Sequence, residues 1–351
     1  MNKLTLKQQK IIQIFLEKGK MQSSEVHREM VKAGEVISLV TIKRALSEMA
    51  EKGILEIVGS GRSTSYALSC RGRIFADVDL KQYVAIEPDK RCGLQQYNFD
   101  LLRAFPSDIF TADELKELEA STIEYKKRTA DLSLVIQKKE LERLVIELAW
   151  KSSKIEGNTY TLLDTEKLIL ENKEAAGHSK SETQMILNHK DAFSYIRQHS
   201  SQFKTVTRKN LEELHAVLVK NLNVNLGFRT KPVGVVGSIY RPLGNIYQIA
   251  EAVDELSVAV SRVETPYAKA LLALLGVCYI QPFEDGNKRT SRLMANALLV
   301  SHCLAPLSYR SVDEENYRGA VLAFYELNSI VPMKKIFIDQ YGFAAKNYAV
   351  K

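Results

Sequence analysis

The chain has 351 residues, of which 45% are hydrophobic and 26% charged, a composition typical of a soluble globular protein with two or three domains. Its longest apolar run, 270–280, is far shorter than the ~20 residues of a membrane span, so we expect a buried helix and no membrane partner. The four cysteines show no paired spacing, which excludes a disulfide or zinc framework and predicts a cytoplasmic protein.

The net charge of +7 is concentrated at the amino-terminal end. Residues 1–73 hold thirteen Lys and Arg against seven Glu, a net charge of +6, and the rest of the chain contributes only +1. A basic block on a nearly neutral body indicates a module for an anionic partner. Nucleic acid is the first candidate for that partner.

This basic block predicts three helices and two short strands. Apolar periodicity places the helices at 6–18, 24–31 and 39–51, and the strands at 54–58 and 65–68. Ser23 or Ser24 is the expected cap of the second helix, and Ser38 that of the third. Residues 59–62 make a tight turn between the strands.

This element order resembles a winged helix-turn-helix domain. In such a domain the third helix would present Thr41, Lys43, Arg44 and Ser47 to a DNA major groove, and Arg62 at the wing tip would reach the backbone or minor groove. The alternative is a winged helix used for dimerisation or protein docking, whose cations are merely solvated. DNA is the favoured partner because of the charge bias.

Residues 71–110 are predicted to be a connector with some strand alternation over 78–86. Beyond it the pattern is mostly helical, starting with a capping box at Thr111 and Glu114. Residues 231–247 are rich in Gly, Pro, Val and Ile and predict a β-hairpin. The expected helices cover 112–130, 137–153, 164–172, 181–199, 207–222, 248–261, 266–280, 287–303, 313–328 and 333–346.

The most informative stretch is 281–292, Gln-Pro-Phe-Glu-Asp-Gly-Asn-Lys-Arg-Thr-Ser-Arg, which opens a predicted helix. Backbone N–H groups at a helix start favour anions, and the helix dipole adds to this preference. A carboxylate beside them, Asp285, can hold a divalent metal that bridges phosphate oxygens. Arg289 and Arg292 are three residues apart, so they share a helical face and can grip a polyphosphate.

This stretch resembles the signature of the Fic family, His-Pro-Phe-x-(Asp/Glu)-Gly-Asn-(Gly/Lys)-Arg-x-x-Arg. Gln281 stands in place of the signature histidine, and Lys288 is the choice also seen in the related Doc toxins. Further likeness lies in Leu214-His215-x-x-Leu218, in Gly227-x-Arg229 and in a flap at 237–242. The positions that match are Pro282, Phe283, Asp285, Gly286, Asn287, Lys288, Arg289 and Arg292.

The resemblance implies a mainly α-helical fold, in which a Fic-type helical core with a small β-hairpin flap follows an N-terminal winged-helix domain. We therefore expect a winged helix at 1–70, a connector at 71–110, and a Fic-like domain at 111–351 with an inhibitory helix near 137–157.

The activity implied by the resemblance is transfer of AMP, or a related phosphate-containing group, from a nucleotide such as ATP to a protein hydroxyl. Asp285 would hold Mg²⁺. An anion hole would be formed by the N–H groups near Gly286–Lys288 with the side chain of Asn287, and the β- and γ-phosphates would contact Arg289 and Arg292. The flap residues Gly237, Ser238, Ile239 and Tyr240 would clamp the target by strand addition. The target protein, itself included, and homo-oligomerisation are left open.

A second element, Ser152-Ser-Lys-Ile-Glu156-Gly157, resembles the inhibitory motif (Ser/Thr)-x-x-x-Glu-(Gly/Asn) of self-restrained Fic proteins. A Glu156 carboxylate paired with Arg292 would take the cation meant for the γ-phosphate. The alternative is a helix-terminal Glu followed by a Gly stop.

Gln281 removes the general base that the family histidine provides, since an amide accepts no proton to a useful degree. Four explanations stay open: a nucleotide-sensing pseudoenzyme, a slow transferase with another base, a different reaction such as AMP removal, and an introduced His→Gln change. Two functional hypotheses follow. The first is a Fic-type nucleotidyltransferase scaffold, restrained by Glu156 and weakened by Gln281. The second is a nucleotide-responsive DNA-binding regulator without catalysis.

Overall fold

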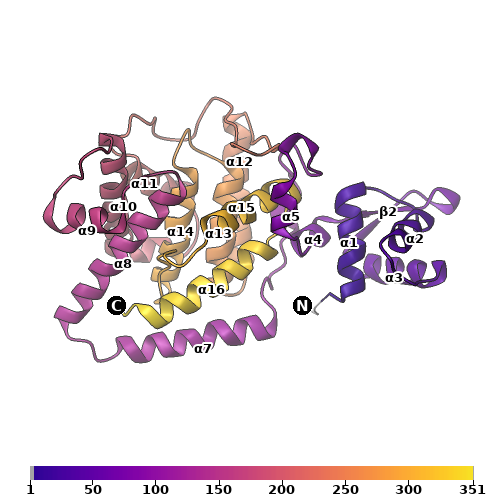
Figure 1. Ribbon diagram of the computed structural model, residues 1–351, viewed down its shortest axis with the longest axis horizontal. Helices are drawn as coiled ribbons and strands as arrows, with labels where there is room; N and C mark the ends of the chain where they lie inside the picture. Colours follow the sequence, from indigo (N-terminus) through magenta and orange to yellow (C-terminus); the bar gives the residue numbers. More distant parts are fainter. Residues whose placement is uncertain (1–3, 351) are drawn as a thin grey trace. The chain divides into compact units, whose positions relative to one another are not determined.

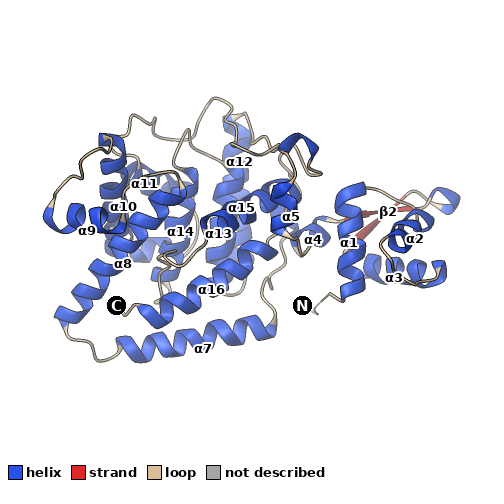
Figure 2. Ribbon diagram, in the orientation of Figure 1, coloured by secondary structure: helices blue, strands red, loops and turns tan. Residues whose placement is uncertain are grey.

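The computed structural model describes residues 4–350, which are mainly helical and contain one two-stranded sheet (Figures 1 and 2). Residues 1–3 and 351, the ends of the predicted domain ranges 1–70 and 111–351, lie outside this description. None of the described helices is long and apolar enough to cross a membrane.

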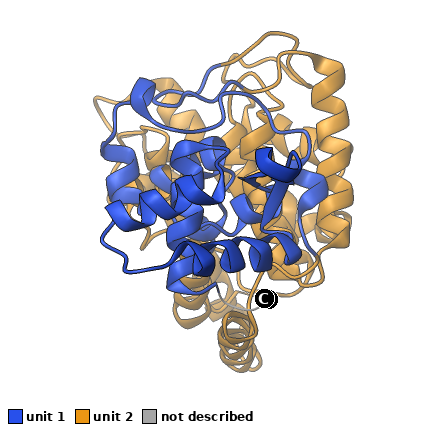
Figure 3. Cartoon of the chain, turned by 90° about the vertical axis from the view of Figure 1, so that its right-hand side faces the viewer, with its two compact units in different colours: residues 1–106, 234–241, 319–334 blue, residues 107–233, 242–318, 335–351 orange. Residues whose placement is uncertain are grey.

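The chain divides into two compact units (Figure 3). Unit 1 holds the residues up to Pro106 together with Gly234–Arg241 and Gly319–Lys334. Unit 2 holds Ser107–Val233, Pro242–Arg318 and the residues from Lys335 onward. The domain boundaries expected near 70 and 110 stay a prediction.

Unit 1 begins with the predicted winged-helix order of three helices and a two-stranded antiparallel sheet. The elements are α1 (Leu6–Lys18), α2 (Ser23–Lys32), α3 (Leu39–Glu51), β1 (Leu55–Val58) and β2 (Ser65–Leu68), with Leu55 opposite Leu68 and Val58 opposite Ser65. Their shared core includes Ile11, Phe15, Val26, Ile42, Leu46 and Leu68.

Two local predictions in unit 1 are wrong. The cap of α2 is Gln22 instead of Ser23 or Ser24, because the Glu25 carboxylate accepts the Gln22 N–H at 2.7 Å. The alternation over 78–86 gives a helix, α5 (Leu80–Ala85), instead of a strand. Asp79 caps this helix by accepting the Gln82 N–H, so local side-chain capping decides its structure.

The rest of the connector region consists of short helical pieces. These are α4 (Cys70–Ile74), the 3₁₀ turn η2 (Pro88–Lys90) and α6 (Leu101–Ala104). A further 3₁₀ turn, η1 (Gly61–Ser63), lies between the two strands.

The ten helices predicted from residue 112 onward are all present, with bounds that differ by at most four residues. They are α7 (Ala112–Thr129), α8 (Leu134–Ile155), α9 (Leu162–Glu171), α10 (Lys180–Gln198), α11 (Arg208–Leu218), α12 (Ile246–Arg262), α13 (Pro266–Ile280), α14 (Asn287–Ser301), α15 (Glu314–Leu327) and α16 (Val331–Asn347), with the 3₁₀ turn η3 (Ser200–Phe203) before α11. Helix α15 begins in unit 2 and ends in unit 1.

The centre of unit 2 is the pair α13 and α14, which lie side by side (Figure 1). Helix α12 packs on α13, while α8, α10 and α11 contact α14. The apolar run predicted to be a buried helix is part of α13, and all of its residues are buried. A Cβ on Gly276 would lie 2.3 Å from the Leu256 side chain, so glycine at this position lets Leu256 of α12 pack directly against α13.

The predicted β-hairpin at 231–247 is absent: the segment is irregular until α12 begins. Arg241 forms an isolated bridge with Gln96, and the Ser238 N–H bonds back to Val235 in a turn. Pro232 and Pro242 have no N–H to offer a ladder, which explains why the apolar residues between them do not pair as strands.

Candidate functional site

The loop 281–286 connects α13 to α14, and a residue in the left-handed region stands at each of its ends. Gln281, the C-cap of α13, has φ 52°, and Gly286, the N-cap of α14, has φ 80°. A left-handed glutamine is a costly conformation that persists only where its surroundings enforce it. Conformations of this kind gather at functional sites.

Two side chains fix the shape of this loop. The Asn287 amide accepts the Phe283 N–H at 2.9 Å and donates to the Phe283 carbonyl at 2.8 Å. The ring of His215 stacks on Phe283 with centroids 3.7 Å apart, and its Nε2 donates to the Asp285 carbonyl at 3.0 Å. Burial lowers the pKa of His215 to about 4, so the ring is neutral and carries its proton on Nε2.

The N–H groups in the first turn of α14 have no acceptor within the helix. The loop before them is held in shape, and N–H groups at a helix start favour an anion, so the predicted anion hole fits this geometry. The predicted contribution of the Asn287 side chain to this anion hole stays a prediction, since its amide contacts Phe283 here.

A buried arginine fixes the position of Gln281. The side chain of Arg229 donates to the carbonyls of Gln281, at 2.6 Å, and of Lys231, at 2.8 Å, and its N–H donates to the Pro282 carbonyl. The Gln281 amide donates to the Cys278 carbonyl at 2.7 Å. Gln281 therefore acts as a hydrogen-bond donor at the end of α13.

Arg289 and Asp285 form an ion pair of 2.9 Å in which the arginine side chain is buried and the carboxylate is 68% exposed. Burial lowers the pKa of Arg289, although a guanidinium keeps its proton in proteins. Its Nη1 is buried and has no hydrogen-bond acceptor in the part of the chain that the structure describes. Such a cation is suited to an incoming anion, which would satisfy the remaining donor.

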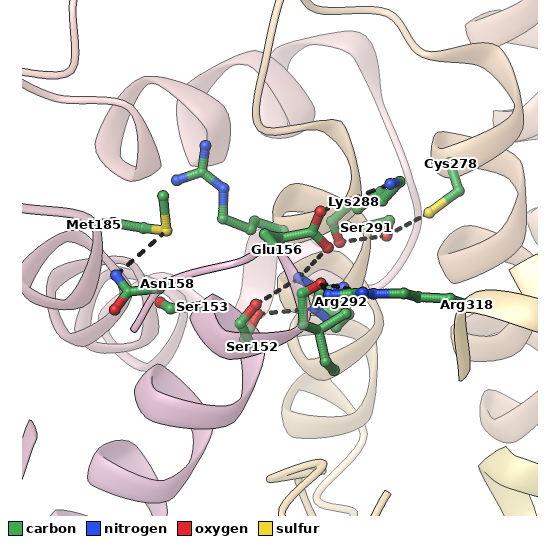
Figure 4. A network of polar contacts seen from close by, with 12 residues as sticks. Ser152, Ser153, Glu156, Asn158, Met185, Cys278, Lys288, Ser291, Arg292 and Arg318 are labelled. Atoms are coloured by element: carbon green, nitrogen blue, oxygen red, sulfur yellow. Dashed lines mark hydrogen bonds and ion pairs between the residues drawn. The ribbon is translucent and has the colours of Figure 1, made fainter. Parts of the chain in front are cut away.

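Arg292 is fully buried and is held by the end of α8. It forms an ion pair with Glu156 at 2.9 Å, and it donates from Nε to the Ser152 hydroxyl and from Nη2 to the Ser152 carbonyl, both at 2.8 Å. Lys288 is 3.7 Å from the other oxygen of Glu156. In Figure 4 the Glu156 carboxylate points toward these two cations, and Ser152 lies against Arg292.

The charges around Glu156 keep it ionised. Partial burial opposes ionisation, but the positive charges of Arg292 and Lys288 outweigh it and hold the pKa of Glu156 below its ordinary value. The guanidinium of Arg292 also stacks over the ring of Tyr317, with 5.6 Å between its carbon and the ring centroid.

Helix α8 ends at Glu156 through specific backbone contacts. Gly157 follows with φ 96°, a conformation that favours glycine, and its N–H bonds to the Lys154 carbonyl. Arg318 on α15 donates to the Ile155 carbonyl from Nε at 3.1 Å and from Nη2 at 2.6 Å. These contacts place the Glu156 carboxylate beside α14.

His189 on α10 extends this network. Its Nδ1 lies 2.8 Å from the Met185 carbonyl and its Nε2 lies 2.9 Å from the Ser152 hydroxyl. Because the carbonyl only accepts, Nδ1 donates, and Nε2 accepts the Ser152 proton. Burial lowers the pKa of His189 to about 3, which keeps this tautomer neutral.

The structure thus brings most predicted site residues together within unit 2. Residues 285–292, Gln281, Ser152, Glu156 and Gly157 all lie around the start of α14. Sequence reasoning missed His189, Arg318 and Tyr317. Each lies on a helix whose periodicity does not distinguish a residue that contacts Arg292 or α8 from an ordinary core residue.

The other predicted residues lie in unit 1. Gly237, Ser238, Ile239 and Tyr240 form the irregular segment described above. Thr41, Lys43 and Arg44 are exposed on α3, and Arg62 is exposed in η1. Arg44 is paired with Glu48 at 3.0 Å, which reduces the charge it presents.

Asp285 offers an exposed carboxylate to a metal at the start of α14, whereas the Glu156 carboxylate is paired with Arg292. No group of three His, Cys, Asp or Glu side chains suited to a metal occurs among residues 4–350. Mg²⁺ often binds through one or two carboxylates and substrate phosphates, and the exposed carboxylate of Asp285 fits that arrangement.

Two family models match parts of the chain. The model of the Fic/DOC family matches residues 205–299, from just before α11 to near the end of α14. The chain contains a Fic/DOC domain. The model of the ferric uptake regulator family matches residues 2–75, the range of the winged helix.

Curated relatives carry the name protein adenylyltransferase Fic. The relative from Drosophila melanogaster is 29% identical over 238 residues, which cover 63% of this chain and 48% of that protein. The relative from Drosophila willistoni is 31% identical over 166 residues, 46% of this chain and 33% of that protein. The chain therefore spans about half or less of the length of these relatives.

Solved structures share the fold. A Fic-domain-containing signalling protein from Bacteroides thetaiotaomicron has a TM-score of 0.56 at 20% identity. The match covers 66% of this chain and 94% of that protein's chain. Fic-1 from C. elegans has a TM-score of 0.56 at 16% identity, and the match covers 68% of this chain and 72% of the Fic-1 chain. At these identities the likeness establishes the fold of the Fic domain and its surrounding helices.

Proposed function

We propose that the start of α14 binds the phosphates of a nucleotide and that Glu156 restrains this binding. The observation that carries the proposal is the buried Arg292 in its ion pair with Glu156, 2.9 Å long. The Glu156 carboxylate neutralises the same guanidinium charge that a phosphate oxygen would neutralise. Nucleotide and Glu156 would therefore compete for the same cation.

The reaction we propose for this scaffold is transfer of AMP from ATP to a protein hydroxyl, with release of pyrophosphate, since the relatives are named adenylyltransferases. The N–H groups at Gly286–Lys288 would bind phosphate oxygens, and Arg289 and Arg292 would contact the outer phosphates. Asp285 would hold Mg²⁺, which when bound neutralises phosphate charge. Segment 237–240 would position the target protein, which is unidentified and includes the chain itself.

Gln281 limits this reaction. Its amide accepts no proton, and loss of a positioned base costs roughly 10²- to 10⁴-fold in rate. Binding of phosphate needs no base, so the proposed site keeps nucleotide affinity while turnover is slow. Among the explanations for Gln281, a weakened transferase and a nucleotide sensor both require this retained binding.

The test of the transfer proposal uses the double variant Gln281→His with Glu156→Gly. We expect it to transfer label from α-labelled ATP to itself or to proteins of a cell lysate, at least about 10²-fold faster than Gln281→Ala with Glu156→Gly. The Ala variant is the matched control, because it has the same open site without a base. Equal labelling by the two variants would rule out the proposed reaction.

A second candidate function is a nucleotide-responsive DNA-binding regulator. The winged helix, its match to a regulator family over residues 2–75 and the positive charge of this part of the chain favour it. Fluorescence polarisation with a DNA duplex, with and without ATP, tests the idea. We expect affinity to fall steeply with salt, and salt-insensitive or absent binding would exclude it.

A further inference from the structure

Glu326, near the end of α15, is a fully buried carboxylate surrounded by donors from other segments of unit 1. From the connector, Tyr83 donates to it at 2.6 Å and Arg91 forms an ion pair with it at 3.3 Å. From segment 237–240, the Ser238 hydroxyl donates at 2.7 Å and the Ile239 N–H at 3.2 Å. One carboxylate thus joins the connector to the irregular segment.

Arg91 strengthens the same connection from the other side. Its side chain is 3% exposed, and its Nη2 donates to the Gly237 carbonyl. Both partners of the Arg91–Glu326 pair therefore hold the backbone of segment 237–240. A buried ion pair of this kind is strongly disrupted when one partner loses its charge, because the other is left uncompensated.

The residues that follow Glu326 are bonded to the end of the winged-helix region. The Ile330 N–H donates to the Ile74 carbonyl at 3.1 Å, and the Ser329 hydroxyl donates to the Ala76 carbonyl at 2.6 Å. Ala76 belongs to the winged-helix core. The end of α15 is therefore fixed to the winged helix a few residues from where it holds segment 237–240.

We propose that Glu326 is a positioning residue that, with Arg91, fixes segment 237–240 within the unit that carries the winged helix. Segment 237–240, which would position the target protein, is then held by residues of its own unit. The part of this proposal that concerns the target rests on the proposed function.

The direct test is hydrogen exchange of the full chain, followed by mass spectrometry of peptides that cover 234–241. We expect Glu326→Gln to speed exchange in this segment by roughly tenfold or more, because its N–H and hydroxyl lose a charged acceptor. The control is Glu87→Gln, which removes an exposed carboxylate paired with Lys90 in the same unit and leaves the segment unchanged.

Ser238→Ala guards against a misfolded Glu326 variant, because it leaves the Arg91–Glu326 pair intact. It removes the hydrogen bond from the Ser238 hydroxyl to Glu326 and the bond that this hydroxyl accepts from the Tyr240 N–H at 3.2 Å. We expect a smaller but measurable increase in exchange over 234–241. If neither variant changes exchange in this segment, the anchoring role of Glu326 is wrong.

A second readout tests the positioning of the target. In the Gln281→His and Glu156→Gly background, adding Glu326→Gln is expected to slow self-labelling at saturating ATP by roughly tenfold. The KM for ATP is expected to stay unchanged. Faster exchange without slower labelling would overturn the positioning role. If the background itself transfers no label, the proposed transfer fails, and the exchange experiment still decides the anchoring.

Discussion

Arg292 is a predicted phosphate contact and also a buried residue that joins α14 to the end of α8. It is fully buried and is satisfied by Glu156 and Ser152 from the end of α8. Removing Glu156 leaves a buried cation without its counter-charge, which lowers stability and raises the attraction for an anion. In the proposed function, the contact between Glu156 and Arg292 therefore adds stability and lowers the affinity for phosphate.

The buried histidines predict a pH dependence of stability. The pKa of His189 is lowered from 6.5 to about 3 by burial, and that of His215 to about 4. Between these values and 6.5 the unfolded chain binds more protons than the folded chain, so stability falls as pH decreases through this range. Each histidine contributes a slope of up to ~1.4 kcal/mol per pH unit.

Urea denaturation between about pH 7 and pH 5 measures this slope. His189→Gln is the informative variant, because the glutamine carbonyl can still accept the proton of Ser152 without titrating. We expect a shallower decline of stability with decreasing pH than in the parent chain. A decline of equal slope would show that His189 does not titrate as inferred.

At the scale of elements, the end of α8 depends on Gly157. An alanine at its φ of 96° is strained by roughly 1–2 kcal/mol, and relief of that strain would move Glu156 away from α14. We expect Gly157→Ala to lower thermal stability and to tighten binding of ATP–Mg²⁺ measured by calorimetry.

The matched control is Gly177→Ala, in the loop between α9 and α10. Gly177 has φ 84° and, like Gly157, has open space where a Cβ would lie. The Gly177→Ala variant should lose a similar amount of stability without a change in its affinity for ATP–Mg²⁺. If the two variants bind ATP–Mg²⁺ with equal affinity, Gly157 has no part in the proposed restraint by Glu156.

The helices were predictable because their periodicity and caps are local. Capping boxes such as that of Thr111 and Glu114 and the apolar run of α13 specify helices without tertiary information. The secondary structure predicted at 78–86 and 231–247 was wrong. These short alternating or apolar segments have no helical period, and hydrogen bonds from side chains determine their structure. There a cap at Asp79, and bonds from Glu326 to Ser238 and Ile239, set the structure.

The candidate site was predictable to the extent that it follows helical spacing. Asp285 and Arg289 pair because they are four residues apart at the start of α14. The pairing of Glu156 with Arg292 was expected only from the resemblance to a family. His189 and Arg318 reach the site through packing of α10 and α15, which no local pattern encodes.

At the scale of the whole molecule, the positive charge of the winged helix predicts salt-dependent DNA binding. Removing one cation that binds a DNA phosphate should reduce the slope of log K against log salt by ~0.9. We therefore expect Lys43→Ala and Arg62→Ala each to flatten the slope by about that amount. Arg44→Ala should have a smaller effect, because Arg44 is paired with Glu48.

Polarisation titrations with one DNA duplex over a series of salt concentrations provide these slopes. Lys139→Ala, which removes an exposed cation from unit 2, is the control and should leave the slope unchanged. Equal slopes for Lys43→Ala, Arg62→Ala and the parent chain would contradict DNA binding through α3 and η1.

We infer that the start of α14 binds nucleotide phosphates and that Glu156 restrains this binding. Calorimetric titration of the chain and of Glu156→Gly with ATP–Mg²⁺ tests this claim most directly, with Glu174→Gly in an exposed loop as the control. The predicted result is affinity roughly tenfold or more higher for Glu156→Gly, since a charged competitor is removed from Arg292. Affinity equal to that of the chain and of Glu174→Gly, or no binding by any of the three, would contradict it.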